Sequence, residues 1–191
     1  IIQGSVFFAF FLSIVFLLSG YEWLKMCKKL NLLKFFGIIF LSVSFFHAFL
    51  FRENIGLYNF LFVVLICIFT DIGGYIFGKI FKGPKLTKIS PNKTYSGVLG
   101  SFLLSIISGQ IFLNYFGKRE IVDSDYLFVF LIILLISLIS QIGDLIISYF
   151  KRIAKVKDTG KILPGHGGLL DRIDGIIFAL PFSYFLIKIF S

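Results

Sequence analysis

Cysteine and histidine are scarce in this chain of 191 residues, which contains two of each. Cys27 and Cys67 form no C-x-x-C pair and have no histidine at zinc-ligand spacing, so we assign them neither a metal nor a disulfide. A P-loop, GxxxxGK[ST], is also absent, so an ordinary nucleotide-binding fold is not expected. Strict alternation of polar and apolar residues is missing from runs such as 126–140, which argues against a β-barrel.

Acidic residues are also few, with 10 Asp and Glu against 19 Lys and Arg and a net charge of +9. In a soluble protein this balance would suggest a nucleic-acid partner. However, 58% of the residues are hydrophobic and 19% are aromatic, whereas soluble domains have about 45–50% apolar residues. The composition therefore predicts a polytopic membrane protein with no nucleic-acid partner, and its basic residues are those of cytoplasmic loops.

Apolar runs long enough to cross a bilayer recur along the whole chain and predict an all-α integral membrane protein with about six transmembrane helices. The predicted spans are residues 2–19, 35–51, 58–78, 96–116, 126–148 and 173–190. We expect one membrane domain over 1–191, with N-terminal spans in 1–57 and the catalytic region in 58–191. The first span could instead be the core of a signal peptide, but no basic region precedes it and no clear A-x-A site follows.

The loops between these spans alternate in charge. The loops after the first, third and fifth spans hold 15 of the 19 basic residues, which are all except Arg52, Lys118, Arg119 and Lys188. The positive-inside rule places these loops in the cytoplasm and both ends of this chain on the opposite side. The chain starts Ile1-Ile2 without Met, so we expect it to be a fragment or a processed product.

Two carboxylates fall within predicted spans, Asp71 in FTDIGGY and Asp144 in SQIGDLI. A charge at mid-membrane costs about 2.5–3.5 kcal/mol on insertion scales, so such residues usually face a cavity or a cation. Both are expected toward the cytoplasmic ends of their helices. The alternative is that each carboxylate pairs with a nearby lysine and closes a helix end, which is less expected for Asp144 because few cations are near it in sequence.

Asp171 and Asp174 lie three residues apart at the start of the last predicted span, so they share one helix face. Asp171 could be only an N-cap, and Asp174 only a favourable charge near a helix N-terminus. The glycine-rich segment 165–168, GHGG, comes directly before them. Such a loop leading into a helix N-terminus is a reasonable arrangement for binding phosphate.

The loop after the third span adds five lysines at 79, 82, 85, 88 and 93 and ends in SPNKTYSG. Lys82, Lys85 and Lys88 are typical of a contact with anionic lipid. Lys93 differs because polar residues and Pro91 surround it at the mouth of a span. Carboxylates and cationic loops that converge on one membrane face favour Mg²⁺ and a polyphosphate, which is the chemistry of phosphoryl or nucleotidyl transfer.

Residues 148–174 contain a more specific motif, which consists of SYFKR, four further residues, KD, and then LPGHGGLLDRID from residue 163. This pattern resembles the signature of the phosphatidate cytidylyltransferases, or CDP-diacylglycerol synthases. Upstream, QIGDL at 141–145, SPNKT at 90–94 and DIGGY at 71–75 resemble further motifs of that family in the same order, and YEW at 21–23 fits more weakly. The resemblance covers nearly all of the chain.

The resemblance implies that CTP and phosphatidic acid give CDP-diacylglycerol and pyrophosphate with Mg²⁺, at the cytoplasmic face of a bacterial inner membrane. It also suggests a homodimer. Carried over by motif, the expected catalytic residues are Asp144, Asp171, Lys151 and Arg172. The expected metal ligands are Asp144, Asp171 and Asp174. The expected substrate-binding residues are Lys93, Ser90, Asn92, Thr94, Asp71, Arg152, Lys157, Gly165, His166, Gly167 and Gly168. His166 would bond phosphate or order its loop.

Two carboxylates of the family pattern are absent, because Ser96 and Ile147 stand where relatives commonly have Glu. This departure leaves a catalytically silent relative as one alternative. A CTP-dependent enzyme that acts on another lipid phosphate is a second. An ion-coupled transporter is the alternative from a different class, but it predicts charges spread across the membrane depth rather than gathered at one face. A CDP-alcohol phosphotransferase is disfavoured, because the pattern DGxxAR…GxxxD…D is absent.

Overall fold

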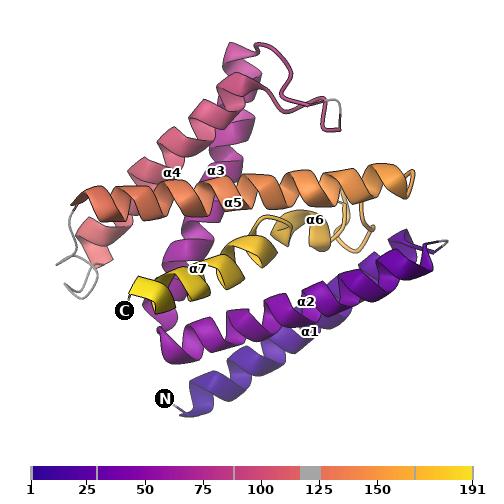
Figure 1. Cartoon of the computed structure of the whole chain (residues 1–191), viewed down its shortest axis with the longest axis horizontal. Helices are drawn as coiled ribbons and strands as arrows, with labels where there is room; N and C mark the ends of the chain where they lie inside the picture. Colours follow the sequence, from indigo (N-terminus) through magenta and orange to yellow (C-terminus); the bar gives the residue numbers. More distant parts are fainter. Residues whose placement is uncertain (1, 29, 88, 117–125, 166, 191) are drawn as a thin grey trace.

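The computed structural model describes residues 2–28, 30–87, 89–116, 126–165 and 167–190. Within these ranges the chain forms seven helices and no strand apart from isolated bridges in two loops. The helices are α1 (Ile2–Met26), α2 (Asn31–Asn54), α3 (Leu57–Phe81), α4 (Tyr95–Phe116), α5 (Tyr126–Ile153), α6 (Leu170–Ile173) and α7 (Ile176–Phe190) (Figure 1). The predicted all-α fold is therefore confirmed.

Five helices, α1 to α5, are long and apolar enough to cross a membrane among the described residues, and they match the first five predicted spans. α1 continues to Met26, beyond the predicted end near residue 19, because Trp23 and Met26 are buried against the rest of the protein. The sixth predicted span, 173–190, corresponds to α7, and the short α6 precedes it. With 15 residues, α7 is about 22 Å long, shorter than the hydrocarbon core of a typical bilayer.

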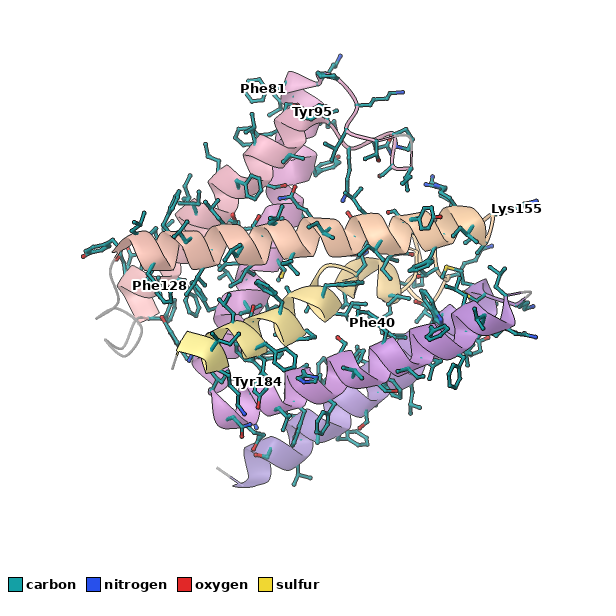
Figure 2. The ribbon with its side chains drawn as sticks, viewed as in Figure 1. Phe40, Phe81, Tyr95, Phe128, Lys155 and Tyr184 are labelled. Carbon is teal, nitrogen blue, oxygen red and sulfur yellow. The ribbon has the colours of Figure 1, made fainter. Side chains whose placement is uncertain are left out.

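The outer faces of the long helices carry large apolar side chains in all directions (Figure 2). Phe7, Phe10, Leu99 and Ile111 are more than half exposed, as expected for side chains that face lipid rather than water. The two chain ends lie at one side of the protein, whereas the α1–α2 turn and the α5–α6 loop lie at the other (Figure 1). The protein is therefore an integral membrane protein, with the α1–α2 turn and the α5–α6 loop at the same side.

The interior contains two clusters of buried apolar side chains. One joins Phe51 on α2, Ile66 on α3 and Ile133 on α5, together with the inner face of α7. The other, at the end that holds the α5–α6 loop, includes Trp23 and Leu170. Cys27 and Cys67 lie in these clusters as free, buried thiols, so α1, α2, α5 and α7 are held together by apolar packing.

A proline inside α7 is accommodated by a neighbouring helix. Pro181 has no N–H to donate to the carbonyl of Ile177, four residues earlier. The hydroxyl of Ser44 on α2 donates a hydrogen bond to that carbonyl. The contact therefore satisfies a buried backbone acceptor and holds α7 in register against α2.

Helices α3 and α4 pack as a close hairpin that extends away from the other helices (Figure 1). A Cβ on Gly73 would overlap the carbonyl of Gly100 and lie 2.9 Å from Cα of Ser101. Small residues thus let the two backbones touch, and the hydroxyl of Ser101 donates to the carbonyl of Thr70 at 2.7 Å. This close approach places Asp71 on α3 beside the start of α4.

Candidate active site

The loop between α3 and α4 is folded back on itself by backbone hydrogen bonds. The N–H of Leu86 donates to the carbonyl of Lys93 at 2.8 Å, and the N–H of Lys93 donates to the carbonyl of Ser90 at 3.1 Å. Thr94 precedes α4 and its hydroxyl accepts a hydrogen bond from the N–H of Gly97 at 3.1 Å, which is the geometry of a helix N-cap. Lys93 is thereby held at the mouth of the α3–α4 hairpin, as its position in the motif predicted.

Asp171 on α6 organises the second polar loop, between α5 and α6. Its Oδ2 accepts hydrogen bonds from the N–H and hydroxyl of Thr159 at 2.9 and 3.0 Å and from the N–H of Gly168 at 3.0 Å. Its Oδ1 accepts from Lys151 Nζ at 2.8 Å. Burial alone would raise the pKa of Asp171, but Lys151 and these N–H groups hold the pKa below its ordinary value.

The α3–α4 loop faces α5 and α6 across one cavity of about 350 Å³. Polar and charged side chains make up most of its wall, together with a few small residues. The lining residues are Thr70, Asp71, Gly74, Tyr75, Ser90, Asn92, Lys93, Thr94, Gly97, Val98, Ser101, Gln141, Asp144, Lys151, Asp171, Arg172 and Asp174. The structure therefore brings ten predicted site residues from α3, the α3–α4 loop, α5 and the segment 171–174 to one place.

Carboxylates and lysines alternate around this cavity. Asp144 on α5 forms an ion pair with Lys93 and accepts a hydrogen bond from the Ser148 hydroxyl at 3.2 Å. Asp174, which is 6% exposed, lines the same cavity as Asp71 and Asp144. A bound cation would reduce the repulsion among these carboxylates.

The carboxylates suit a divalent cation only in part. No group of three His, Cys, Asp or Glu side chains in the described ranges is close enough together to bind a metal ion. Asp144 and Asp171 nevertheless line one cavity. Mg²⁺ typically takes one or two protein carboxylates and completes its octahedron with water and substrate phosphates. The residues present therefore fit a magnesium ion that arrives with a polyphosphate better than one held by the protein alone.

Several predicted site residues lie outside the cavity lining. Arg152 donates to two backbone carbonyls, those of Ile89 and Val156, both at 3.2 Å, and so ties the two polar loops together. Lys157, Gly165, Gly167 and Gly168 belong to the α5–α6 loop but not to the wall of the cavity as described. His166 lies outside the described residues. For all six, substrate binding stays a prediction.

Other residues of this region were not predicted to take part. Thr70 and Gln141 line the cavity. Gln141 is the first residue of the motif QIGDL, and Thr70 directly precedes the motif DIGGY. Glu22 at the end of α1 reaches the α5–α6 loop and bonds its backbone. Its place in YEW was a weak signal, and nothing local in the sequence indicated a contact so far along the chain.

Comparison with known proteins gives a consistent result. Residues 3–190 match the model of the cytidylyltransferase family. The phosphatidate cytidylyltransferase of Bacillus subtilis is 40% identical over 150 residues, which are 76% of this chain and 54% of that protein. The phosphatidate cytidylyltransferase of Rickettsia bellii is 35% identical over 170 residues, 86% of this chain and 73% of that protein. The chain thus spans about half the length of its Bacillus relative.

Proposed function

Because this chain belongs to the cytidylyltransferase family, we propose that its protein is an enzyme that transfers CMP from CTP to phosphatidic acid and releases pyrophosphate. The relatives from Bacillus subtilis and Rickettsia bellii carry the name of this activity. One structural observation carries the proposal furthest. Lys93 comes from the α3–α4 loop, Asp144 and Lys151 from α5, and Asp171 from α6, yet all four line a single cavity.

The basic residues of the cavity would bind the phosphates. Lys93 and Lys151 each pair with a carboxylate, Asp144 and Asp171 respectively, and Arg172 lies on the same wall. When a triphosphate enters, these ammonium groups can turn from the carboxylates to phosphate oxygens. Each carboxylate is then free to bind a cation. The ion pairs would thus keep the site assembled and neutral before substrates bind.

In the transfer itself, an oxygen of the phosphatidic acid phosphate attacks the α-phosphorus of CTP. A new phosphorus–oxygen bond forms, the bond between the α-phosphorus and the bridging oxygen breaks, and its electron pair leaves on pyrophosphate. The attacking phosphate is already ionised at neutral pH, so the chain need not supply a general base. Its basic side chains instead position both substrates and stabilise the charge that develops on the leaving group.

Asp144 and Asp171 would hold Mg²⁺, with Asp174 as a further ligand or an orienting partner. The bound ion would supply charge neutralisation between the phosphates and the carboxylates. The carboxylate of Asp171 would keep its contacts with Thr159 and Gly168 through Oδ2 and offer Oδ1 to the ion.

The cavity would open on the cytoplasmic face of a bacterial cell membrane, because 15 of the 19 basic residues flank that side. A soluble nucleotide could reach the lysine loops there, while the acyl chains of the lipid remain among the exposed apolar helix faces. The predicted homodimer belongs to the same proposal.

The test is nucleotidyl transfer by the purified protein in detergent with α-labelled CTP, phosphatidic acid and Mg²⁺. Asp144→Asn and Asp171→Asn remove the two carboxylates with little change in shape. Glu53→Gln is the matched control, since Glu53 pairs with Arg52 and Ser5 at the opposite end of α2. We expect labelled CDP-lipid from the wild type and the control only, and its loss when the metal is chelated.

A folded wild type that binds CTP but transfers nothing to any phosphatidic acid would contradict the proposal and favour a silent relative. If product formed only with a different lipid phosphate, the proposed reaction would stand but phosphatidic acid would not be the acceptor. If CTP did not bind at all, the cytidylyltransferase activity would be excluded and ion transport would be the next measurement.

A further inference from the structure

Glu22 is a buried carboxylate that belongs to none of the segments lining the cavity. It lies near the C-terminal end of α1 and is 1% exposed. Its closest polar partners are almost 150 residues away in sequence, in the loop that leads into α6. Burying a carboxylate is costly unless hydrogen bonds compensate it, so these partners account for its presence there.

Both oxygens of Glu22 accept hydrogen bonds from this loop. Oε1 accepts from the N–H of Leu169 at 3.1 Å, and Oε2 accepts from the N–H of Leu170 at 2.8 Å. The hydroxyl of Thr159 lies 3.3 Å from Oε2. The carboxylate therefore holds two successive backbone donors at the point where α6 begins.

Two glycines make room for this carboxylate. A Cβ on Gly168 would lie 2.6 Å from Oε2 of Glu22, and a Cβ on Gly160 would overlap Oε1. The loop backbone thus encloses the head of the side chain from two sides. A carboxylate enclosed this closely restricts how far the loop can move.

Glu22 acts on the same turn as Asp171, from the opposite side. The hydroxyl of Thr159 lies between them, 3.0 Å from Asp171 Oδ2 and 3.3 Å from Glu22. Gly168 donates its N–H to Asp171, and the next two residues donate theirs to Glu22. Any shift of this turn would move Asp171 and, through their 2.8 Å contact, Lys151.

We propose that Glu22 is a positioning residue for the transfer reaction: by holding the N–H groups of Leu169 and Leu170, it aims Asp171 and Lys151 into the cavity. This inference rests on the proposed function. Glu22 touches no substrate and transfers no proton. Through its hydrogen bonds, the rigid end of α1 fixes a glycine-rich turn that could otherwise adopt several conformations.

Glu22→Gln tests the role with almost no change in volume. Glutamine has one acceptor oxygen instead of two, and its NH₂ group would face a backbone N–H that is also a donor. We expect kcat/KM for CTP to fall about 10- to 100-fold, the effect of a displacement of about 1 Å at a reacting centre. The KM for CTP should rise while the KM for phosphatidic acid stays the same.

Hydrogen exchange measures the contact without relying on activity. In the wild type, the amides of Leu169 and Leu170 are bonded to Glu22 and should exchange slowly. In Glu22→Gln, faster exchange should be confined to peptides from the segment 159–171. Glu53→Gln, a carboxylate at the other end of the α1–α2 pair, should change neither the exchange nor the kinetics.

Thr159→Val and Thr159→Ser provide a second, milder pair if Glu22→Gln does not fold. Valine removes the hydroxyl between the two carboxylates, whereas serine keeps it. Thr159→Val should raise the KM for CTP, whereas Thr159→Ser should have the same KM for CTP as the wild type.

Glu22→Gln with a wild-type KM for CTP and only a smaller amount of folded protein would overturn the positioning role, since Glu22 would then merely stabilise the fold. If the wild type itself transferred nothing, the proposed function would fail as well. The hydrogen-exchange result would then still report separately whether Glu22 holds the turn.

Discussion

Lys151 Nζ lies 2.8 Å from Asp171 Oδ1, and each side chain is only 11% exposed. The two residues lie on α5 and α6, at either end of the glycine-rich loop. Since the other oxygen of Asp171 is held by Thr159 and Gly168, this ion pair links the loop to the rigid helix α5. The ion pair therefore fixes the position of α6 against α5, and its two residues also line the cavity.

Lys151→Met should abolish most nucleotidyl transfer, because it removes the ammonium that we propose binds phosphate and leaves Asp171 without its cation. We expect kcat/KM for CTP to fall at least about 100-fold. We also expect a lower thermal midpoint, since a buried carboxylate loses its partner. Lys161→Met, at an exposed lysine of the same loop, is the control and should behave as the wild type. Wild-type kinetics of Lys151→Met would exclude Lys151 from the reaction.

Acid should remove the stabilising contribution of Asp171. Its pKa is lowered in the folded protein, so the contribution is complete above the unfolded value of about 3.9 and is lost as the pH falls through the folded value. The difference in thermal midpoint between wild type and Asp171→Asn should be constant from pH 7 to about pH 5 and shrink below about pH 4. A difference that grows on acidification would contradict the depressed pKa.

The membrane helices were predictable because hydrocarbon imposes a long apolar run on each crossing segment. The helix ends were less so, since Trp23 and Met26 extend α1 by packing against distant residues, which no local pattern reveals. The sixth predicted span, 173–190, corresponds to α7, which begins at Ile176. The short α6 before it was not predicted, because its four residues carry no periodic pattern of their own.

The convergence of the motifs was predictable from the sequence, since Asp71, Lys93, Asp144 and Asp171 line one cavity; their roles in the reaction stay predictions. The ion-pair partner of each charged side chain was not predictable from the sequence. Asp144 seemed to have few cations nearby, yet Lys93 reaches it from a loop that is distant in sequence. The contacts of Glu22 likewise depend on how α1 packs, so they belong to the tertiary structure and not to any spacing in the sequence.

The hydrogen bond from Ser44 to the carbonyl of Ile177 should matter only while Pro181 is present. Ser44→Ala leaves a buried carbonyl without a donor and should cost about 1–3 kcal/mol of stability. In a Pro181→Ala background, the new N–H at position 181 can bond that carbonyl within α7, so the same substitution should cost much less. Thermal unfolding of the four proteins in detergent gives the coupling energy. Equal costs in both backgrounds would show that Ser44 stabilises the protein by another contact.

Gly73→Ala should loosen the α3–α4 hairpin and disturb the cavity that it borders. The added Cβ would lie 2.8 Å from the carbonyl carbon of Gly100 and 2.9 Å from Cα of Ser101. These are backbone atoms that cannot rotate away, so the helices must separate, at a cost of about 1–3 kcal/mol. Because Asp71 lies two residues before Gly73 and Lys93 lies at the mouth of the hairpin, transfer activity should fall together with the thermal midpoint.

Gly20→Ala is the matched control for that substitution. On α1 the same added Cβ would meet only Ile38 Cδ1, at an ordinary contact distance of 3.5 Å. Alanine is also the better helix former, so stability should stay the same or increase slightly. Equal losses in Gly73→Ala and Gly20→Ala would mean that any helix glycine is sensitive in this membrane protein. A loss in Gly73→Ala alone ties the close approach of α3 and α4 to the geometry of the cavity, because only there would the two backbones be forced apart.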